Sequence, residues 1–284
     1  MKPPKMIRTK GDGIEIQFAE WPGEGQTVFC LHGLTANCRS FDAIAAGISP
    51  PHRVLAMDLR GRGLSDKPAS GYSLDHHCRD LEAAARDLGV NSFYLMGHSL
   101  GAYVALAYAA GHPEQVKGII LVDGGAARTL EQWAKISAGI QPSVDRLGKD
   151  FPSFDAYVEL IRKAPFMQPW NQTADDYFKY ESEETPDGKI RSRINPANIN
   201  EERGNLLTMD AAQYYPLIKS PVLILRAVQG MVMEDDLVLP REAMPAMRAA
   251  LPQARVVDLP GINHYTIAFH SSEPRDQAIL DFLG

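Results

Sequence analysis

Short apolar runs alternate along the chain with longer stretches in which apolar residues recur at spacings of three and four. Short runs that are almost wholly apolar are typical of strands in a parallel sheet covered on both faces. The clearest helical stripe extends from Leu74 to Leu88 and closes at Gly89, a residue type that favours a helix C-terminus. Further helices are predicted at 99–110 and 273–283. Six apolar runs lie at 27–31, 53–57, 92–96, 117–122, 221–225 and 255–259.

The repeated order of strand and then helix predicts an α/β fold with right-handed crossovers and an open parallel sheet. This alternation stops after residue 122. The stretch 126–216 is rich in Trp, Tyr, Pro and charged residues, and it shows helical patterns but no strand pattern. Because long insertions usually carry function, we predict a helical cap at 126–216, inserted into a core domain made of 1–125 and 217–284. The alternative is a run of ordinary surface helices.

One pentapeptide carries the strongest chemical signal. Gly97-His98-Ser99-Leu100-Gly101 follows a predicted strand and opens a predicted helix. In that setting the G-x-S-x-G pattern is typical of a nucleophile on a strained turn, where side chains in place of the glycines would clash with the adjoining strand and helix. Open α/β sheets bind ligands at the same edge. The pattern therefore predicts Ser99 as a nucleophile; the alternative is a plain strand-to-helix turn.

Three further segments complete a recognisable set of motifs. His32-Gly33-Leu34 follows an early strand, residues 58–66 read D-L-R-G-R-G-L-S-D, and residues 261–264 read G-I-N-H after the last strand. Together with the pentapeptide 97–101, which we call the elbow, these segments resemble the α/β-hydrolase superfamily from about residue 12 to the end of the chain. The resemblance implies the α/β-hydrolase fold, a mostly parallel open sheet flanked by helices with an inserted helical cap. It also implies an oxyanion hole formed by the backbone N–H groups of Leu34 and Leu100.

A serine nucleophile needs a general base, and eight histidines are candidates. His264 lies in a turn after the last predicted strand, from which a loop at the sheet edge can carry it over Ser99. We therefore predict His264 as the base. The others are expected near turns or ends in solvent (His52, His112, His270), on a helix surface (His76, His77), or as structural neighbours of the oxyanion turn and the elbow (His32, His98).

The third member of the triad departs from the common family pattern. After the run 221–225 most relatives carry a G-x-x-D motif, but here the acids Glu234, Asp235 and Asp236 arrive several residues late. Asp123 follows the run 117–122 and stands 123 − 99 = 24 positions after the nucleophile, about one helix and one strand. Some haloalkane dehalogenases and the acetamidomethylene-succinate hydrolases resemble this arrangement. We favour Asp123 over Asp235 or Asp236, because triads are defined by geometry and not by chain order.

Composition limits the partners of the protein. With 284 residues, 45% of them apolar, the chain is long enough to bury a sizeable core, and a net charge of −6 disfavours binding to nucleic acid or to an anionic membrane. Three cysteines without metal spacing favour reduced thiols, and residues 1–13 lack the apolar segment of a signal peptide, so we expect a cytoplasmic protein. No metal or organic cofactor is expected, since the G-x-x-x-x-G-K-[ST] and H-E-x-x-H motifs are absent.

The predicted reaction is acyl transfer. Ser99, deprotonated by His264, attacks a carbonyl and forms an acyl-enzyme, which water then hydrolyses. A serine at the elbow argues against epoxide hydrolases and haloalkane dehalogenases, which resemble this fold but use aspartate there. Because a helical cap over a serine resembles carboxylesterases, esters of short to medium acyl chain are the expected substrates. The alternatives are cleavage of a C–C or C–N bond in a ring-fission product, towards which Asp123 points, and lactone hydrolysis or perhydrolysis.

Two groups of cap residues are candidates for substrate binding. Arg191, Arg193 and Arg203 could hold a substrate carboxylate, although charged clusters are usually solvated. Seven aromatic residues could line an acyl pocket: Trp133, Phe166, Trp170, Tyr177, Phe178, Tyr214 and Tyr215. Because fold alone does not define function, a second hypothesis is a non-catalytic receptor that keeps the triad and binds a ligand without turnover. We expect a monomer or a homodimer that acts on a small molecule.

Overall fold

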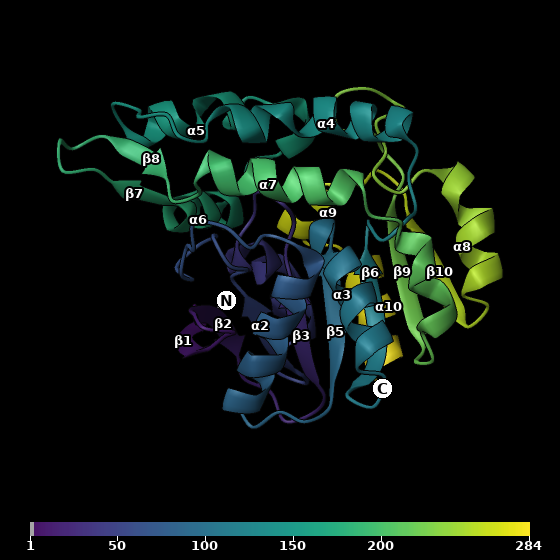
Figure 1. The fold of residues 1–284 in the computed structure, drawn as a ribbon. Coiled ribbons are helices and arrows are strands. Elements are labelled where there is room, and N and C mark those ends of the chain that lie inside the picture. Colours follow the sequence, from purple (N-terminus) through teal and green to yellow (C-terminus); the bar gives the residue numbers. More distant parts are fainter. Residues whose placement is uncertain (1–2) are drawn as a thin grey trace.

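An eight-stranded, mostly parallel sheet forms the centre of the protein (Figure 1). The structure is a computed structural model, and it describes residues 3–284. The strands lie in the order β1-β2-β4-β3-β5-β6-β9-β10, with β1 and β2 antiparallel to their neighbours and the others parallel. Their bounds are β1 Lys5–Lys10, β2 Glu15–Trp21, β3 Thr27–Leu31, β4 Arg53–Met57, β5 Phe93–His98, β6 Val116–Val122, β9 Val222–Ala227 and β10 Ala254–Leu259.

All six strands predicted from the apolar runs are present, at β3, β4, β5, β6, β9 and β10. The prediction missed β1 and β2, which pair with each other at one edge of the sheet. Their sequences, KMIRTK and EIQFAEW, mix charged and apolar residues. The edge strand β1 is mostly exposed and needs no continuous apolar run, whereas the apolar residues of the buried strand β2 are interrupted by the buried polar residue Gln17, so neither strand gave the apolar signal.

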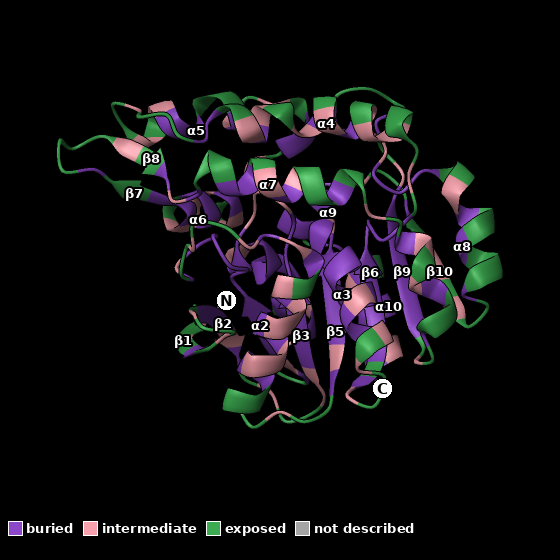
Figure 2. Ribbon diagram, viewed as in Figure 1, coloured by how far each residue is buried: buried purple, intermediate pink, exposed green. Residues whose placement is uncertain are grey.

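Helices cover both faces of the sheet, and successive strand residues point to opposite faces. Phe29 and Leu31 of β3 belong to one buried cluster, which also holds residues of α2, α3 and α8. Val28 and Cys30 belong to a second cluster, with α1 and α10. Figure 2 shows the resulting burial of the strands between the helices. The helices of the two layers are α1 Asp42–Ile48, α2 Leu74–Asp87, α3 Leu100–Gly111, α8 Met244–Ala250, α9 Thr266–Phe269 and α10 Glu273–Leu283.

The segment between β6 and β9 crosses the end of the sheet at which β5 and β6 finish (Figure 1). Three of its helices match the helical patterns of the sequence, but the expectation of no strand there is wrong, because β7 and β8 form a short antiparallel hairpin. Strands of three residues are too short to leave a periodic signal. The proposed cap comprises α4 Leu130–Asp145, α5 Phe154–Arg162, α6 Gln172–Glu181, β7 Ser182–Glu184, β8 Ile190–Ser192 and α7 Pro196–Leu207.

The cap elements contribute to a third apolar cluster, which includes Tyr157, Val158 and Ile161 of α5 and also Ala268 and Phe269 of α9. Short 3₁₀ turns complete the fold at Cys38–Phe41, Pro165–Met167, Ala211–Gln213, Tyr215–Leu217 and Arg241–Ala243. Within residues 3–284 no helix combines the length and the apolar character needed to cross a bilayer.

Candidate active site

Ser99 occupies a sharp turn between β5 and α3, with a left-handed backbone φ of 55°. The turn depends on the two glycines of the motif. A Cβ atom on Gly97 would lie 2.1 Å from the carbonyl oxygen of Gly101, and a Cβ atom on Gly101 would lie 1.9 Å from the carbonyl oxygen of Leu31. Glycine at both positions therefore lets α3 start directly beside β3 and β5, with Ser99 at its N-terminus.

Asp123 lies directly after β6 and contacts His264. Its Oδ2 atom is 2.7 Å from Nδ1 of His264, and its Oδ1 atom accepts the backbone N–H of Ala227 at 3.1 Å. Asp123 has a backbone φ of 46°, and among the described residues only Ser99 and Asp123 combine a positive φ with a side chain. Such backbone strain clusters at functional sites, so the strained pair marks this end of the sheet.

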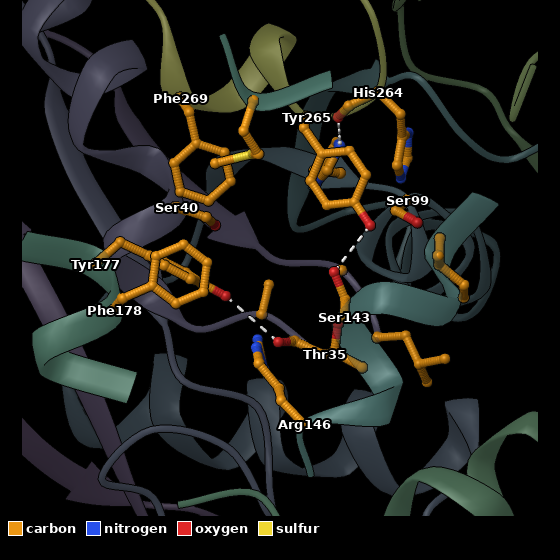
Figure 3. Close-up of a pocket in the computed structure, with 16 residues that line it drawn as sticks. Thr35, Ser40, Ser99, Ser143, Arg146, Tyr177, Phe178, His264, Tyr265 and Phe269 are labelled. Carbon is orange, nitrogen blue, oxygen red and sulfur yellow. Dashed lines mark hydrogen bonds between the residues drawn. The ribbon is translucent and has the colours of Figure 1, made fainter. Parts of the chain in front are cut away.

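His264 follows β10 and faces the cavity that Ser99 also lines (Figure 3). The structure thus places Asp123 against His264, and Ser99 and His264 in the wall of one cavity. The alternative acids lie elsewhere. Asp235 pairs with the Lys135 ammonium at 2.7 Å on the surface. Asp236 is buried and accepts three backbone N–H groups of its own loop, at 2.6, 2.8 and 3.0 Å.

The predicted oxyanion turn lies against the nucleophile. A Cβ atom on Gly33 would come within 3.3 Å of the Cβ of Ser99 and 3.7 Å of its Oγ. In residues 3–284, neither the backbone N–H of Leu34 nor that of Leu100 has a hydrogen-bond partner. Two free donors beside a serine can receive a developing oxyanion, so the geometry is compatible with the predicted role of both residues.

His32 holds the oxyanion turn in place. Its Nε2 atom accepts the backbone N–H of Leu59 at 3.0 Å, so the proton is on Nδ1, which donates to the carbonyl oxygen of Gly33 at 2.8 Å. Burial lowers the pKa of His32 to about 3, which keeps the ring neutral. Because the C=O and N–H of a trans peptide point in opposite directions, this bond on the Gly33 carbonyl also orients the N–H of Leu34.

His98 contacts His264 through its ring and through a hydrogen bond. Its ring centroid lies 4.5 Å from that of His264, and its Nε2 donates to the His264 carbonyl oxygen at 3.0 Å. Burial, reinforced by nearby His264, lowers the pKa of His98 well below its usual range. His32 and His98 are structural neighbours, as predicted. His52 and His77 were expected on the surface and are buried, because partners distant in the sequence cover them.

The cavity above Ser99 is mainly apolar. Figure 3 draws the 16 residues that line it, among them Tyr265, whose hydroxyl lies 2.9 Å from the Ser143 hydroxyl. The lining is Gly33, Leu34, Thr35, Ala36, Ser40, His98, Ser99, Ile140, Ser143, Arg146, Met167, Tyr177, Phe178, His264, Tyr265 and Phe269. Sequence reasoning missed nine of these sixteen residues. Of the nine, Thr35 and Ala36 follow the His32-Gly33-Leu34 motif and Tyr265 follows His264, but the other six have no neighbouring motif as a signal.

Of the seven cap aromatics singled out in the sequence, Tyr177 and Phe178 line this cavity and the other five do not. The three cap arginines are also absent from its walls. Arg191 pairs with Asp150 at 2.7 Å, and Arg193 pairs with Glu183 at 2.8 Å. The arginine at the cavity is Arg146, which the sequence did not indicate.

Arg146 is buried and bonds Oε1 of Glu181 at 3.1 Å. Burial opposes its charge and is the largest single effect, but the Glu181 carboxylate and the neighbouring tyrosine hydroxyls together outweigh it and raise the pKa of Arg146. The guanidinium also lies over the ring of Phe178, 5.3 Å from its centroid. A permanent cation therefore lies in the cavity wall. Among the described residues no cluster of three or more His, Cys, Asp or Glu is arranged to hold a metal ion.

Comparison with known proteins identifies the family to which this fold belongs. The family described as "alpha/beta hydrolase fold" matches residues 26–271 of the chain. The protein belongs to the α/β-hydrolase family. The family match and the relatives described next support a hydrolase of this family.

Two curated relatives match this α/β hydrolase over most of its length. A 2-(acetamidomethylene)succinate hydrolase from Mesorhizobium japonicum is 30% identical over 269 residues, covering 92% of this chain and 89% of the relative. An N-formylmaleamate deformylase from Pseudomonas putida is 26% identical, covering 84% of each chain. Among solved structures, that of an E-2-(acetamidomethylene)succinate hydrolase superimposes with a TM-score of 0.83 at 24% identity, covering 99% of both chains, which establishes the shared fold.

Proposed function

We propose that this α/β hydrolase cleaves the C–N bond of a small, N-acylated molecule that carries a carboxylate. The observation that carries the proposal is the contact between His264 and an acid placed after β6, in a chain similar along its length to two enzymes of related chemistry. Both relatives are named for a compound with an acylated nitrogen and a carboxylic acid group. This reaction was the alternative in the sequence analysis, and it now replaces simple ester hydrolysis as the first choice.

In the proposed mechanism Ser99 Oγ attacks the acyl carbonyl and passes its proton to Nε2 of His264. Asp123 accepts the Nδ1–H of His264, holds that tautomer and stabilises the imidazolium that forms. The N–H groups of Leu34 and Leu100 would bind the tetrahedral oxyanion, and donors of this kind typically contribute about 10²–10³ in rate each. The imidazolium then protonates the leaving nitrogen, and the C–N bond breaks. Water, deprotonated by His264, releases the acid from Ser99.

Arg146 supports the carboxylate part of the proposal. Among residues 3–284 it is the one Lys or Arg side chain in the cavity wall, and arginine binds carboxylates through paired N–H donors. Removing Arg146 alone would leave Glu181 buried and unpaired, so the test variant is Arg146→Met combined with Glu181→Gln. We expect this double variant to raise KM for the carboxylate substrate by about tenfold or more, and to leave KM for a neutral ester nearly unchanged. An equal rise for both substrates would remove Arg146 from substrate binding.

Ester hydrolysis is the second candidate, favoured by the apolar wall of the cavity. Ile140, Met167, Phe178 and Phe269 all line it, and such side chains suit an acyl chain without charge. In this case Arg146 would be neutralised by Glu181 and serve packing alone.

The test is a comparison of kcat/KM for three substrates with purified protein. They are 2-(acetamidomethylene)succinate, N-formylmaleamate and a series of p-nitrophenyl esters, each with Ser99→Ala as the control. The proposal predicts that an N-acyl substrate gives the highest kcat/KM and that Ser99→Ala abolishes turnover. A preference for esters of short or medium chain, with little N-acyl cleavage, would favour the second candidate. Turnover that survives Ser99→Ala would contradict both.

A further inference from the structure

Arg62, a buried residue of the loop after β4, touches the predicted oxyanion turn. Its side chain has no solvent exposure, and its Nε donates to the carbonyl oxygen of Leu34 at 3.1 Å. Its Nη1 donates to the carbonyl oxygen of Arg60 at 2.9 Å, and its Nη2 pairs with Oε2 of Glu202. The guanidinium thus joins three parts of the molecule through three of its N–H groups.

Glu202 belongs to α7, which lies in the proposed cap. Its other carboxylate oxygen, Oε1, lies 2.5 Å from Nε2 of His77 in α2. Glu202 and His77 are as deeply buried as Arg62, with exposures of 1% and 0%. A buried charge is tolerated only when it is paired and hydrogen-bonded, and each charge here depends on the other. The position of Arg62 against Leu34 therefore depends on α7 being in place.

Two further contacts connect the same turn to the cap. The Leu34 side chain packs against a small apolar cluster made of Leu147, Ile194 and Ile199, all from the proposed cap. The hydroxyl of Tyr177, in α6, donates to the carbonyl oxygen of Thr35 at 3.3 Å (Figure 3). With His32 on the Gly33 carbonyl, three successive carbonyls of the turn are held by side chains.

We propose that the cap positions the oxyanion turn through Glu202 and Arg62, so that Arg62 is a positioning residue for the N–H group of Leu34. The carbonyl of Leu34, the direct partner of Arg62, belongs to the peptide that follows this N–H. Two held peptides in succession leave the backbone dihedral angles of Leu34 little freedom, and a preorganised donor is what an oxyanion hole requires. The inference rests on the proposed function, because it presupposes that Leu34 binds the oxyanion.

The test measures the second-order rate constant for labelling of Ser99 by a fluorophosphonate, in which Oγ bonds to phosphorus and fluoride leaves. The test variant is Arg62→Met with Glu202→Gln, which removes both charges together and avoids an unpaired ion. The matched control is Glu201→Gln. Glu201 also connects α7 to the loop after β4, by accepting the backbone N–H groups of Gly71 and Tyr72 at 2.9 Å, but it does not contact Arg62.

We expect labelling of the double variant to be at least about tenfold slower than that of wild type, as expected for a misplaced oxyanion donor. The affinity of an alkylboronic acid, which forms a tetrahedral adduct at Ser99, should weaken by a similar factor. For a turned-over substrate, kcat should fall while KM stays nearly constant. Glu201→Gln should stay within about twofold of wild type in all three measurements.

Each other outcome decides against the inference. A folded double variant that is labelled at the wild-type rate overturns it, with a melting curve establishing that the variant is folded. Equal slowing in the double variant and in Glu201→Gln also overturns it, because the effect would then come from general docking of α7. Wild-type protein that the fluorophosphonate does not label would refute the proposed function itself, and the inference with it.

Discussion

At the residue scale, the site is defined by two strained positions. Ser99 and Asp123 both hold a left-handed backbone, a conformation that costs a residue with a side chain of order 1–3 kcal/mol. Each follows a neighbouring strand, and His264 reaches Asp123 from a third loop. The paired strands and the closely packed glycines beside these two residues hold each strained turn in its conformation.

The cysteines provide a prediction at this scale. Burial raises the pKa of Cys78 to about 12 and shifts the pKa of Cys30 and Cys38 upwards as well, so none of the three forms a thiolate near neutral pH. We expect iodoacetamide at pH 8 to leave the folded protein unmodified and fully active, while protein unfolded in urea takes up label on all three thiols. Intact-mass spectrometry measures both states. Rapid labelling of a thiol in the folded protein would contradict the burial of these thiols in their protonated form.

At the scale of elements, the elbow depends on close contact between β3, β5 and α3. The separation of these elements is set by the glycine positions, since a single methyl group at Gly101 would overlap the backbone of β3. Chemistry and stability are therefore coupled in α3.

Two substitutions in this one helix separate the effects. Gly101→Ala should lower the free energy of unfolding by about 2–3 kcal/mol or more and reduce turnover, because α3 must shift away from β3 and carry Ser99 with it. Gly111→Ala, at the other end of α3, places its methyl group where no heavy atom lies within 4 Å. It should be neutral or stabilise the protein by up to about 1 kcal/mol. Urea unfolding and a turnover assay test both, and equal effects of the two substitutions would contradict this account of the elbow.

At the scale of the whole molecule, the cap and the core are connected by buried polar groups as well as by apolar contacts. Burial alone would raise the pKa of Glu202, but Arg62 and His77 outweigh it and bring the pKa to about 2. An unfolded glutamate titrates near 4.3, as a rough reference. Because the folded pKa is the lower one, Glu202 contributes stability above about pH 4.3 and loses that contribution as the pH falls towards 2.

The linkage predicts how the stability of Glu202→Gln compares with that of wild type. The glutamine cannot titrate, so the gap in unfolding free energy between wild type and variant should narrow by about 2 kcal/mol between pH 5 and pH 3. Urea titrations of both proteins at the two pH values measure the gap. A gap that is constant or that widens towards pH 3 would show that Glu202 is not held as a carboxylate by Arg62 and His77.

The sequence predicted local features of the protein but not the contacts between residues that are far apart in the chain. Buried strands and the elbow were predictable, because a parallel sheet demands apolar runs and a strained turn demands glycine. Asp123 was predicted as the triad acid only because the G-x-x-D motif usual after β9 is missing. The contact between Arg62 and Glu202 joins residues 140 positions apart, and Arg146 meets Glu181 across the cap. Such pairs leave no periodic or local signal, so the cavity wall and the cap contacts required the structure.

The central claim is that Ser99 and His264 work with an acid placed after β6, and kcat of Asp123→Asn tests it most directly. The substitution preserves shape but removes the charge that stabilises the imidazolium of His264. With Asp235→Asn and Ser99→Ala as controls, the account predicts that Asp123→Asn lowers kcat by about 10³–10⁴ in a protein that still folds, while Asp235→Asn remains close to wild type. Near-wild-type turnover in folded Asp123→Asn, or a comparable loss in Asp235→Asn, would contradict the account.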